Sequence, residues 1–242
     1  HRFIDNAFLS SLQGYSQIYG WGSLEAMFIR LKNHDSIWIR LSTPYQCKVD
    51  SIIMIADRYM NGRNRIKGKP HPPPPIHFDD HHFTWLQSSS ASDRLMLLPH
   101  LMQQIHERPE SIQCTEAILT LTLALLPNPD MEWIPPLHLK LAGSWGRYLT
   151  ASLGDYEAAY QWQKVCFTQW CNNGFYDQAS YPMCALMELS PHLPHYEDTI
   201  HSMWLDFANK PNARVSQIRR FIPQYWQQKL FPDAGVQPTS QG

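Results

Sequence analysis

A cluster of histidine and aspartate residues contains the side chains of this chain that are best suited to chemistry. Four histidines and two aspartates fall between residues 71 and 82: His71, His77, Asp79, Asp80, His81 and His82. Imidazole and carboxylate groups are ligands that suit zinc or iron. His77 and His81 are four residues apart and would share one face of a helix. One hypothesis is therefore a metal-binding enzyme or metal sensor that uses His77, Asp79, His81 and His82.

The surrounding sequence favours a polar surface loop for this cluster instead. Four consecutive prolines, residues 72–75, lie within it, and such a run excludes a helix and favours polyproline II. We therefore predict a Pro/His-rich linker or long loop over residues 61–91. The sequence shows no HExxH or GxSxG motif, Gly-rich phosphate loop or kinase signature. We accordingly predict that the chain is not an enzyme and needs no cofactor.

Basic residues gather in two stretches that could contact phosphate groups. The first spans Arg58 to Lys69 and the second spans Arg214 to Lys229. The whole chain, however, carries 20 Lys and Arg against 21 Asp and Glu, a formal net charge of −1. Because this balance lacks the basic excess typical of nucleic-acid-binding proteins, we expect a protein or peptide partner rather than nucleic acid.

The cysteines and the hydropathy pattern bear on the location of the protein. The five cysteines include no CxxC pair, so we expect free, mostly buried thiols in a reducing compartment. The longest apolar run, residues 117–126, reaches only about half-way across a bilayer. The sequence therefore predicts a cytoplasmic protein that does not insert into a membrane.

Most of the remaining chain is predicted to be helical. Apolar residues recur at helical spacing, and the breaks between these segments contain proline, glycine or asparagine. The main expected helices span 49–60, 92–107, 111–126, 133–153, 155–171, 175–189, 195–209 and 213–230. We predict an all-α protein of antiparallel helical hairpins. Its expected parts are an N-terminal helical subdomain (1–60), the linker (61–91), a helical-repeat domain (92–232) and a disordered tail (233–242).

Two turns in the repeat region share one pattern of residues. The sequence Leu-Gly-Asp-Tyr-Glu-Ala-Ala-Tyr at 153–160 is echoed by Asn-Gly-Phe-Tyr-Asp-Gln-Ala at 173–179. In both, glycine is followed by tyrosine two residues later and by alanine five residues later. We expect Gly154 and Gly174 to adopt the left-handed conformation that closes a helix, and the alanines to let the next helix approach closely.

The region from residue 92 to 210 resembles a degenerate tetratricopeptide repeat. If Gly154 is the inter-helix glycine, the matching residues are Tyr156, Ala159 and Cys166. If Gly174 takes that role, the matching residues are Tyr176, Ala179, Met183, Leu186 and Pro191. The two glycines are too close in sequence to fill the same slot of successive repeats of about 34 residues. The resemblance implies hairpins stacked as a short solenoid, and it assigns no binding residue.

Aromatic residues are frequent in this region and could line a groove on the solenoid. Most are expected in the core, and a few on the concave face. The candidates for partner binding are Trp145, Tyr148, Trp162, Trp170, Tyr181 and Trp204. The sequence thus predicts a scaffold, adaptor or regulatory module that binds a peptide or partner helix. A further alternative is a structural subunit of a larger complex.

Overall fold

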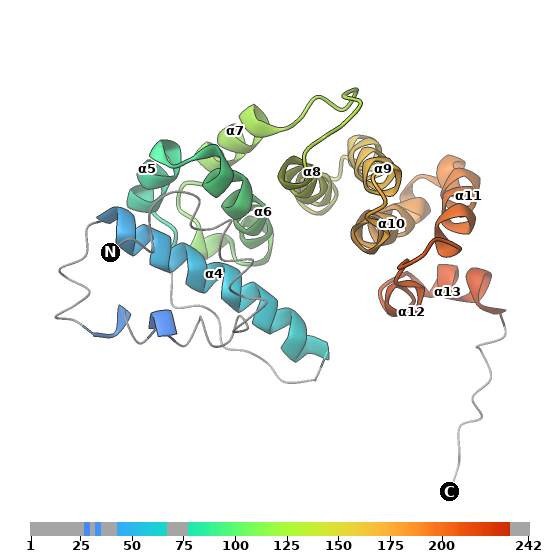
Figure 1. Ribbon diagram of the computed structural model, residues 1–242, viewed down its shortest axis with the longest axis horizontal. Helices are drawn as coiled ribbons and strands as arrows, with labels where there is room; N and C mark the ends of the chain where they lie inside the picture. The colour runs from blue at the N-terminus through green and yellow to red at the C-terminus, as the bar shows by residue number, and fades with distance from the viewer. Residues whose placement is uncertain (1–26, 30–31, 35–42, 67–76, 233–242) are drawn as a thin grey trace, which may run out of the picture. The chain divides into compact units, whose positions relative to one another are not determined.

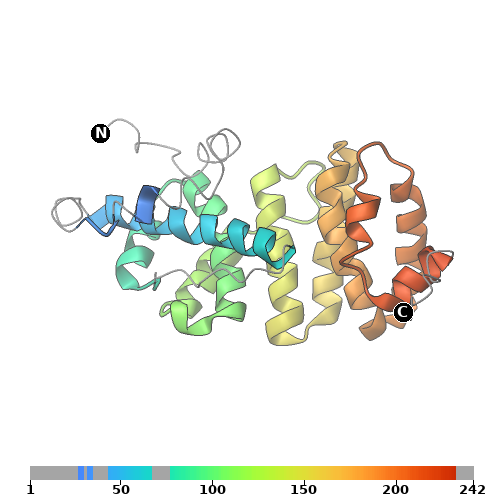
Figure 2. The same cartoon turned by 90° about the horizontal axis from the view of Figure 1, so that it is seen from below.

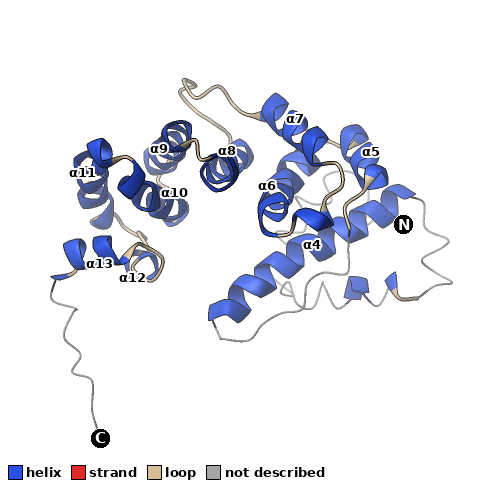
Figure 3. Cartoon of the chain, turned by 180° about the vertical axis from the view of Figure 1, so that it is seen from behind, coloured by secondary structure: helices blue, strands red, loops and turns tan. Residues whose placement is uncertain are grey.

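The computed structural model describes residues 27–29, 32–34, 43–66 and 77–232, and its helices are labelled in Figure 1. Every regular element among these residues is helical (Figure 3), apart from an isolated bridge between Phe78 and Ile112. The all-α prediction is therefore confirmed for this part of the chain. None of the described helices is long and apolar enough to cross a bilayer. The contacts divide the chain into two units, residues 1–126 and 127–242.

The first unit is built around the long helix α4 (Thr43–Ile66), which packs on α5 (Asp80–Ser88) and α6 (Ala91–Glu107). A 3-10 turn, Pro109–Ser111, leads to α7 (Thr115–Leu125), which packs on α6. Fully buried residues of this core include Ile52, Ile53, Leu86, Leu97, Leu98 and Leu101. Aliphatic side chains from α4, α5 and α6 thus hold the unit together.

Helix α5 begins inside the segment that the sequence predicts to be a loop. The carboxylate of Asp79 accepts hydrogen bonds from the backbone N–H groups of His81 and His82, and the ring of His82 reaches back to Asp79. The Asp79 side chain thereby satisfies N–H groups that the first helical turn leaves without partners. The loop prediction is therefore wrong for residues 61–66, which continue α4, and for residues 80–88. The proline run lies outside the described residues.

The division between the units also differs from the predicted boundary. Because α4 packs on α5 and α6, the predicted N-terminal subdomain and the first predicted hairpin form one unit. The chain divides between Leu126 and Pro127 instead of within residues 61–91. Most of the predicted N-terminal helical region before residue 43 lies outside the described residues, as does the predicted tail.

The second unit contains a row of antiparallel helices, with α9 (Tyr156–Asn172) packed between α8 (Pro136–Tyr148) and α10 (Tyr176–Leu189), as Figure 2 shows. One turn of π-helix, Leu149–Leu153, extends α8, and α11 (Glu197–Ala208) packs on α10. The boundaries of α9, α10 and α11 agree with the predicted helices within two residues. The pairing into hairpins is present here, whereas membership of the tetratricopeptide family stays a prediction.

The two turn glycines adopt the backbone conformation that the sequence predicts. Gly154 has φ = 65° and Gly174 has φ = 75°, both in the left-handed region. The alanines five residues after them, Ala159 and Ala179, are fully buried. The predicted roles of glycine as a helix terminator and of alanine as a buried small residue are therefore confirmed.

The prediction of a single helix over residues 213–230 is wrong. The structure has two short helices there, α12 (Val215–Ile218) and α13 (Gln224–Leu230), and Pro223 is the residue immediately before α13. Proline has no N–H to donate to the preceding turn, so the earlier helix cannot continue through it. The buried Trp226 then fixes α13, because its Nε1 donates a hydrogen bond of 2.7 Å to Oγ of Ser190.

Candidate functional site

The histidine cluster contributes a buried polar link between α4 and the start of α5. Nε2 of His82 lies 2.9 Å from Oδ2 of Asp50 on α4, and Nδ1 lies 2.7 Å from Oδ1 of Asp79. Asp50 also accepts a 2.7 Å hydrogen bond from Nζ of Lys32. His82 and Asp50 are both buried. This set of side chains joins three separate segments of the first unit.

The pKa values of this link follow from its partners. Burial by itself would lower the pKa of the His82 imidazole, but hydrogen bonds to Asp50 and Asp79 outweigh it and raise the pKa. For Asp79, burial acts to raise the pKa, while the hydrogen bonds from His82 and His81 lower it overall. The geometry therefore favours a charged imidazolium between two carboxylates.

The predicted metal ligands do not converge on one point. The side chains of His77 and His81 are exposed, and both ring nitrogens of His82 already contact carboxylates. Within the described ranges, no group of three His, Cys, Asp or Glu side chains is arranged to hold a metal ion. The structure thus gives His82 and Asp79 a structural role at the helix cap.

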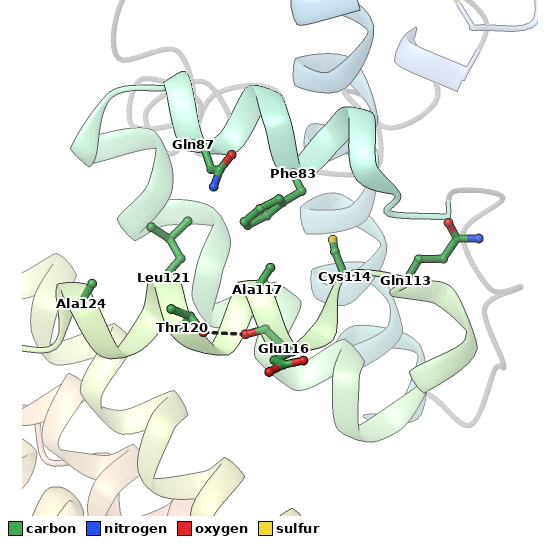
Figure 4. A pocket seen from close by; sticks show the side chains of 9 residues that line it. All are labelled: Phe83, Gln87, Gln113, Cys114, Glu116, Ala117, Thr120, Leu121 and Ala124. Atoms are coloured by element: carbon green, nitrogen blue, oxygen red, sulfur yellow. Dashed lines mark hydrogen bonds between the residues drawn. The ribbon is translucent and has the colours of Figure 1, made fainter.

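A shallow pocket of about 630 Å³ lies between α5 and α7 in the first unit (Figure 4). Its volume falls within the range typical of small-molecule sites. The residues that line it are Phe83, Gln87, Gln113, Cys114, Glu116, Ala117, Thr120, Leu121 and Ala124. Burial raises the pKa of the Cys114 thiol, so this cysteine is not an activated nucleophile. Chemically, the pocket offers an amphipathic surface and no catalytic group that we recognise.

No motif in the sequence predicted this pocket. The signal was the apolar run of α7, in which only Ile118 and Thr122 are fully buried. Leu123, in the same run, is 53% exposed. Helix α7 is apolar on several faces, and the other helices of its unit cover only some of them. The uncovered faces leave apolar surface exposed next to the pocket.

The six aromatic residues predicted to bind a partner are divided between core and surface. Trp170 and Trp204 are buried, where Trp170 packs edge-on against Phe175 and Trp204 against Phe231. These two tryptophans belong to the core and do not line a groove. The packing of aromatic rings at helix interfaces explains their position.

The other four candidates keep some exposed surface. Trp145 and Tyr148 are half-buried and stack on each other along α8, with ring centroids 5.6 Å apart. Trp162 on α9 is also half-buried. Tyr181 on α10 is 59% exposed. Of the predicted set, Tyr181 is therefore the side chain most available to a partner.

Four further aromatic side chains of this unit are exposed and were not among the candidates from the sequence: Trp133, Phe175, Phe221 and Tyr225. Trp133, in the loop before α8, is 53% exposed, and Phe175, in the turn between α9 and α10, is 48% exposed. Trp133 is the first residue of the helix predicted over 133–153, and Phe175 is the first residue of the helix predicted over 175–189. Their local sequence gave no sign that these side chains would face solvent.

Comparison of the chain with protein-family models, with curated proteins and with solved structures found no match. Function is therefore inferred from the side chains and surfaces described above.

Proposed function

We propose that the chain is a non-enzymatic interaction module, a scaffold or adaptor whose second unit holds a peptide or partner helix. The observation that carries this proposal is the exposure of three aromatic side chains, Trp133, Phe175 and Tyr181, on one helical framework. Each of these side chains has roughly half of its surface exposed to solvent, although the helices of the unit pack around a buried core.

Exposed aromatic residues on a rigid framework are suited to protein recognition. Tryptophan and tyrosine supply large contact areas and are enriched among the residues that dominate binding energies. Left-handed glycines close the turns at Gly154 and Gly174, so both ends of α9 are fixed. Less conformational entropy is lost on binding when the framework is already ordered.

The cysteines and the resemblance to helical repeats support the same proposal. All five cysteines are free thiols, which fits a protein of the cytoplasm or another reducing compartment. Stacked helical hairpins of the tetratricopeptide type present extended surfaces to peptides, and the packing of α9 between α8 and α10 supports a proposal of that kind for this unit.

The test is a comparison of two full-length baits in native lysate. One is the unaltered chain, and the other carries Trp133→Ser, Phe175→Ser and Tyr181→Ser together. We expect a saturable protein partner that the first bait retains and the second loses, while Leu153→Ser, which alters another exposed apolar side chain, keeps it. A partner retained equally by all baits would contradict the proposal, as would one zinc or iron per chain and no partner at all.

A further inference from the structure

A buried glutamine holds the loop before α8 in one conformation. Nε2 of Gln169 on α9 donates hydrogen bonds to the backbone carbonyls of Met131, at 2.9 Å, and Glu132, at 3.3 Å. Oε1 of the same side chain accepts a 3.3 Å hydrogen bond from the backbone N–H of Ile134. Gln169 is only 8% exposed. One side chain therefore satisfies three backbone groups of a loop that lies 35 to 38 residues away.

Further contacts fix the loop at both ends. Ile134 is fully buried and anchors its C-terminal side. On the N-terminal side, the Asn128 side chain accepts from the N–H of Asp130 at 3.0 Å, and the N–H of Met131 donates to the carbonyl of Asn128 at 3.2 Å. Prolines 127, 129, 135 and 136 restrict the flanking backbone. The loop is thus ordered before any partner arrives.

The fixed loop keeps apolar side chains in solvent. Met131 is 45% exposed and Trp133 is 53% exposed. Phe175 lies at the same end of α9, because its N–H donates to the carbonyl of Trp170, the residue after Gln169, and its ring packs on that of Trp170. We call Met131, Trp133 and Phe175 the end patch. Exposed apolar side chains of this size, on an ordered backbone at one end of a helix, mark interaction sites.

The loop that carries Met131 and Trp133 has two acidic residues. Asp130 and Glu132 are exposed and alternate in sequence with Met131 and Trp133. Neither carboxylate forms an ion pair with any residue that the structure describes. Two cations lie near this end of the unit. Arg214 is 3.6 Å from Asp177, and Lys210 is close enough to Cys171 to act on the pKa of its thiol. The loop itself therefore presents two carboxylates to a partner.

We propose that the end patch binds a cationic amphipathic helix of a partner protein. Apolar side chains of that helix contact Met131, Trp133 and Phe175, and its Lys or Arg residues lie beside Asp130 and Glu132. Helices of this kind bind through apolar residues at positions three and four apart, and charge complementarity sets their selectivity and association rate. This inference rests on the proposed function and adds the site and the chemistry of the partner.

The experiment uses two synthetic amphipathic helical peptides that share the same leucine positions. One carries lysine on its polar face and the other carries glutamate. Binding of each labelled peptide to the full-length chain is measured by fluorescence anisotropy at low and high salt. The variants are Trp133→Ala, the pair Asp130→Asn with Glu132→Gln, Tyr181→Ala, and Leu153→Ala. Leu153 is a matched control, since it is 59% exposed but lies at the opposite end of α9, beside Gly154.

We expect the lysine peptide to bind and the glutamate peptide not to bind. Trp133→Ala should weaken binding by about thirtyfold, the effect of losing a dominant aromatic contact. The doubly neutralised variant should weaken it several-fold at low salt and make it less sensitive to salt. Leu153→Ala should have little effect, and Tyr181→Ala should weaken binding less than Trp133→Ala does. Circular dichroism of each variant checks that the fold is retained.

Equal binding of the two peptides would overturn the inference, as would no binding of the lysine peptide or unchanged binding after Trp133→Ala. A larger loss of binding with Tyr181→Ala than with Trp133→Ala would also overturn it, but would leave the proposed function intact with its site on α10. The proposed function fails separately, when the lysate experiment recovers no partner that depends on the three aromatic residues.

Discussion

The side chain of Gln163 on α9 fills the space that a side chain at Gly146 on α8 would occupy. A Cβ atom at Gly146 would lie only 2.7 Å from Nε2 of Gln163 and 3.4 Å from the carbonyl oxygen of Ala159. The same Nε2 donates a 2.9 Å hydrogen bond to the carbonyl of Gly143. Gln163 is 2% exposed, so it cannot move aside into solvent. Glycine at position 146 thus permits both the close approach of α8 to α9 and the hydrogen bond between them.

Gly146→Ala should destabilise the protein by roughly 1–3 kcal/mol, the typical effect of overpacking a well-filled interface. The measurement is urea unfolding of the full chain. Gly143→Ala is the matched control, because the nearest atom to a Cβ there is Sγ of Cys166 at 3.9 Å. It should leave stability unchanged or raise it by up to about 1 kcal/mol, since alanine favours a helix over glycine. Equal losses in both variants would refute this explanation of Gly146.

The left-handed glycines predict a second pair of substitutions. At Gly174 nothing lies within 4 Å of an added Cβ, and φ is 75°. Gly174→Ala should therefore destabilise by about 1–2 kcal/mol through backbone strain alone, whereas Gly174→Asn should cost less, because asparagine tolerates this conformation. Thermal unfolding of both variants measures these differences in stability. If alanine proved as stable as glycine, the strain argument would fail.

The link between His82 and its two carboxylates predicts how stability changes with pH. The pKa of His82 is raised above its ordinary value of 6.5 in the folded protein. Its contribution to stability is then fully present below pH 6.5 and is lost as the pH rises through the folded pKa. The pKa of Asp79 is lowered from 3.8, so its contribution is present above pH 3.8 and is lost as the pH falls below that value.

His82→Gln should therefore destabilise the protein more at pH 6 than at pH 9. We expect a loss of roughly 1.5–3 kcal/mol at the lower pH, the magnitude of a hydrogen bond to a charged group, and a smaller loss at the higher pH. Urea unfolding across this range measures the difference. His77→Gln, at an exposed histidine that precedes the same helix, controls for loss of an imidazole. A penalty that is independent of pH would show that His82 is not charged in the folded state.

The sequence predicted those parts of the fold that depend on local signals. The boundaries of α9, α10 and α11 follow from helical spacing of apolar residues and from turns that contain Gly154, Gly174 and Pro191. Helix α5 was missed although its cap is also local, because His82 takes the position where a capping box usually has glutamate or glutamine. The proline run before it favours a loop more strongly than this unusual cap favours a helix.

The sequence could not predict contacts that join distant residues. His82 meets Asp50 across 32 positions, and Gln169 meets Met131 across 38. Helical periodicity places a glutamine on one face of α9, but only the folded backbone shows which carbonyl it reaches. For the same reason the exposure of Trp133 was not foreseen, and two of the six predicted aromatic residues, Trp170 and Trp204, lie in the core.

Replacing Gln169 tests whether this side chain positions the end patch. In Gln169→Leu the N–H of Ile134 and the carbonyl of Met131 lose their buried partner, so we expect a loss of roughly 1–3 kcal/mol. Amide hydrogen exchange at Ile134 should accelerate, and affinity for the lysine peptide should fall although Trp133 is retained. Gln163→Leu is the matched control, because Gln163 is also buried on α9 but bonds to Gly143 of α8.

The control should lose comparable stability and leave the exchange of Ile134 and the peptide affinity close to those of the unaltered chain, once global opening is subtracted. Gln169→Glu separates the two kinds of hydrogen bond further, since a carboxylate can still accept from the N–H of Ile134 but can no longer donate to the carbonyls of Met131 and Glu132. Ile134 should then stay partly protected while the affinity still falls. If Gln163→Leu and Gln169→Leu changed exchange and affinity alike, Gln169 would act only through the stability of the unit, and the loop would order itself without it.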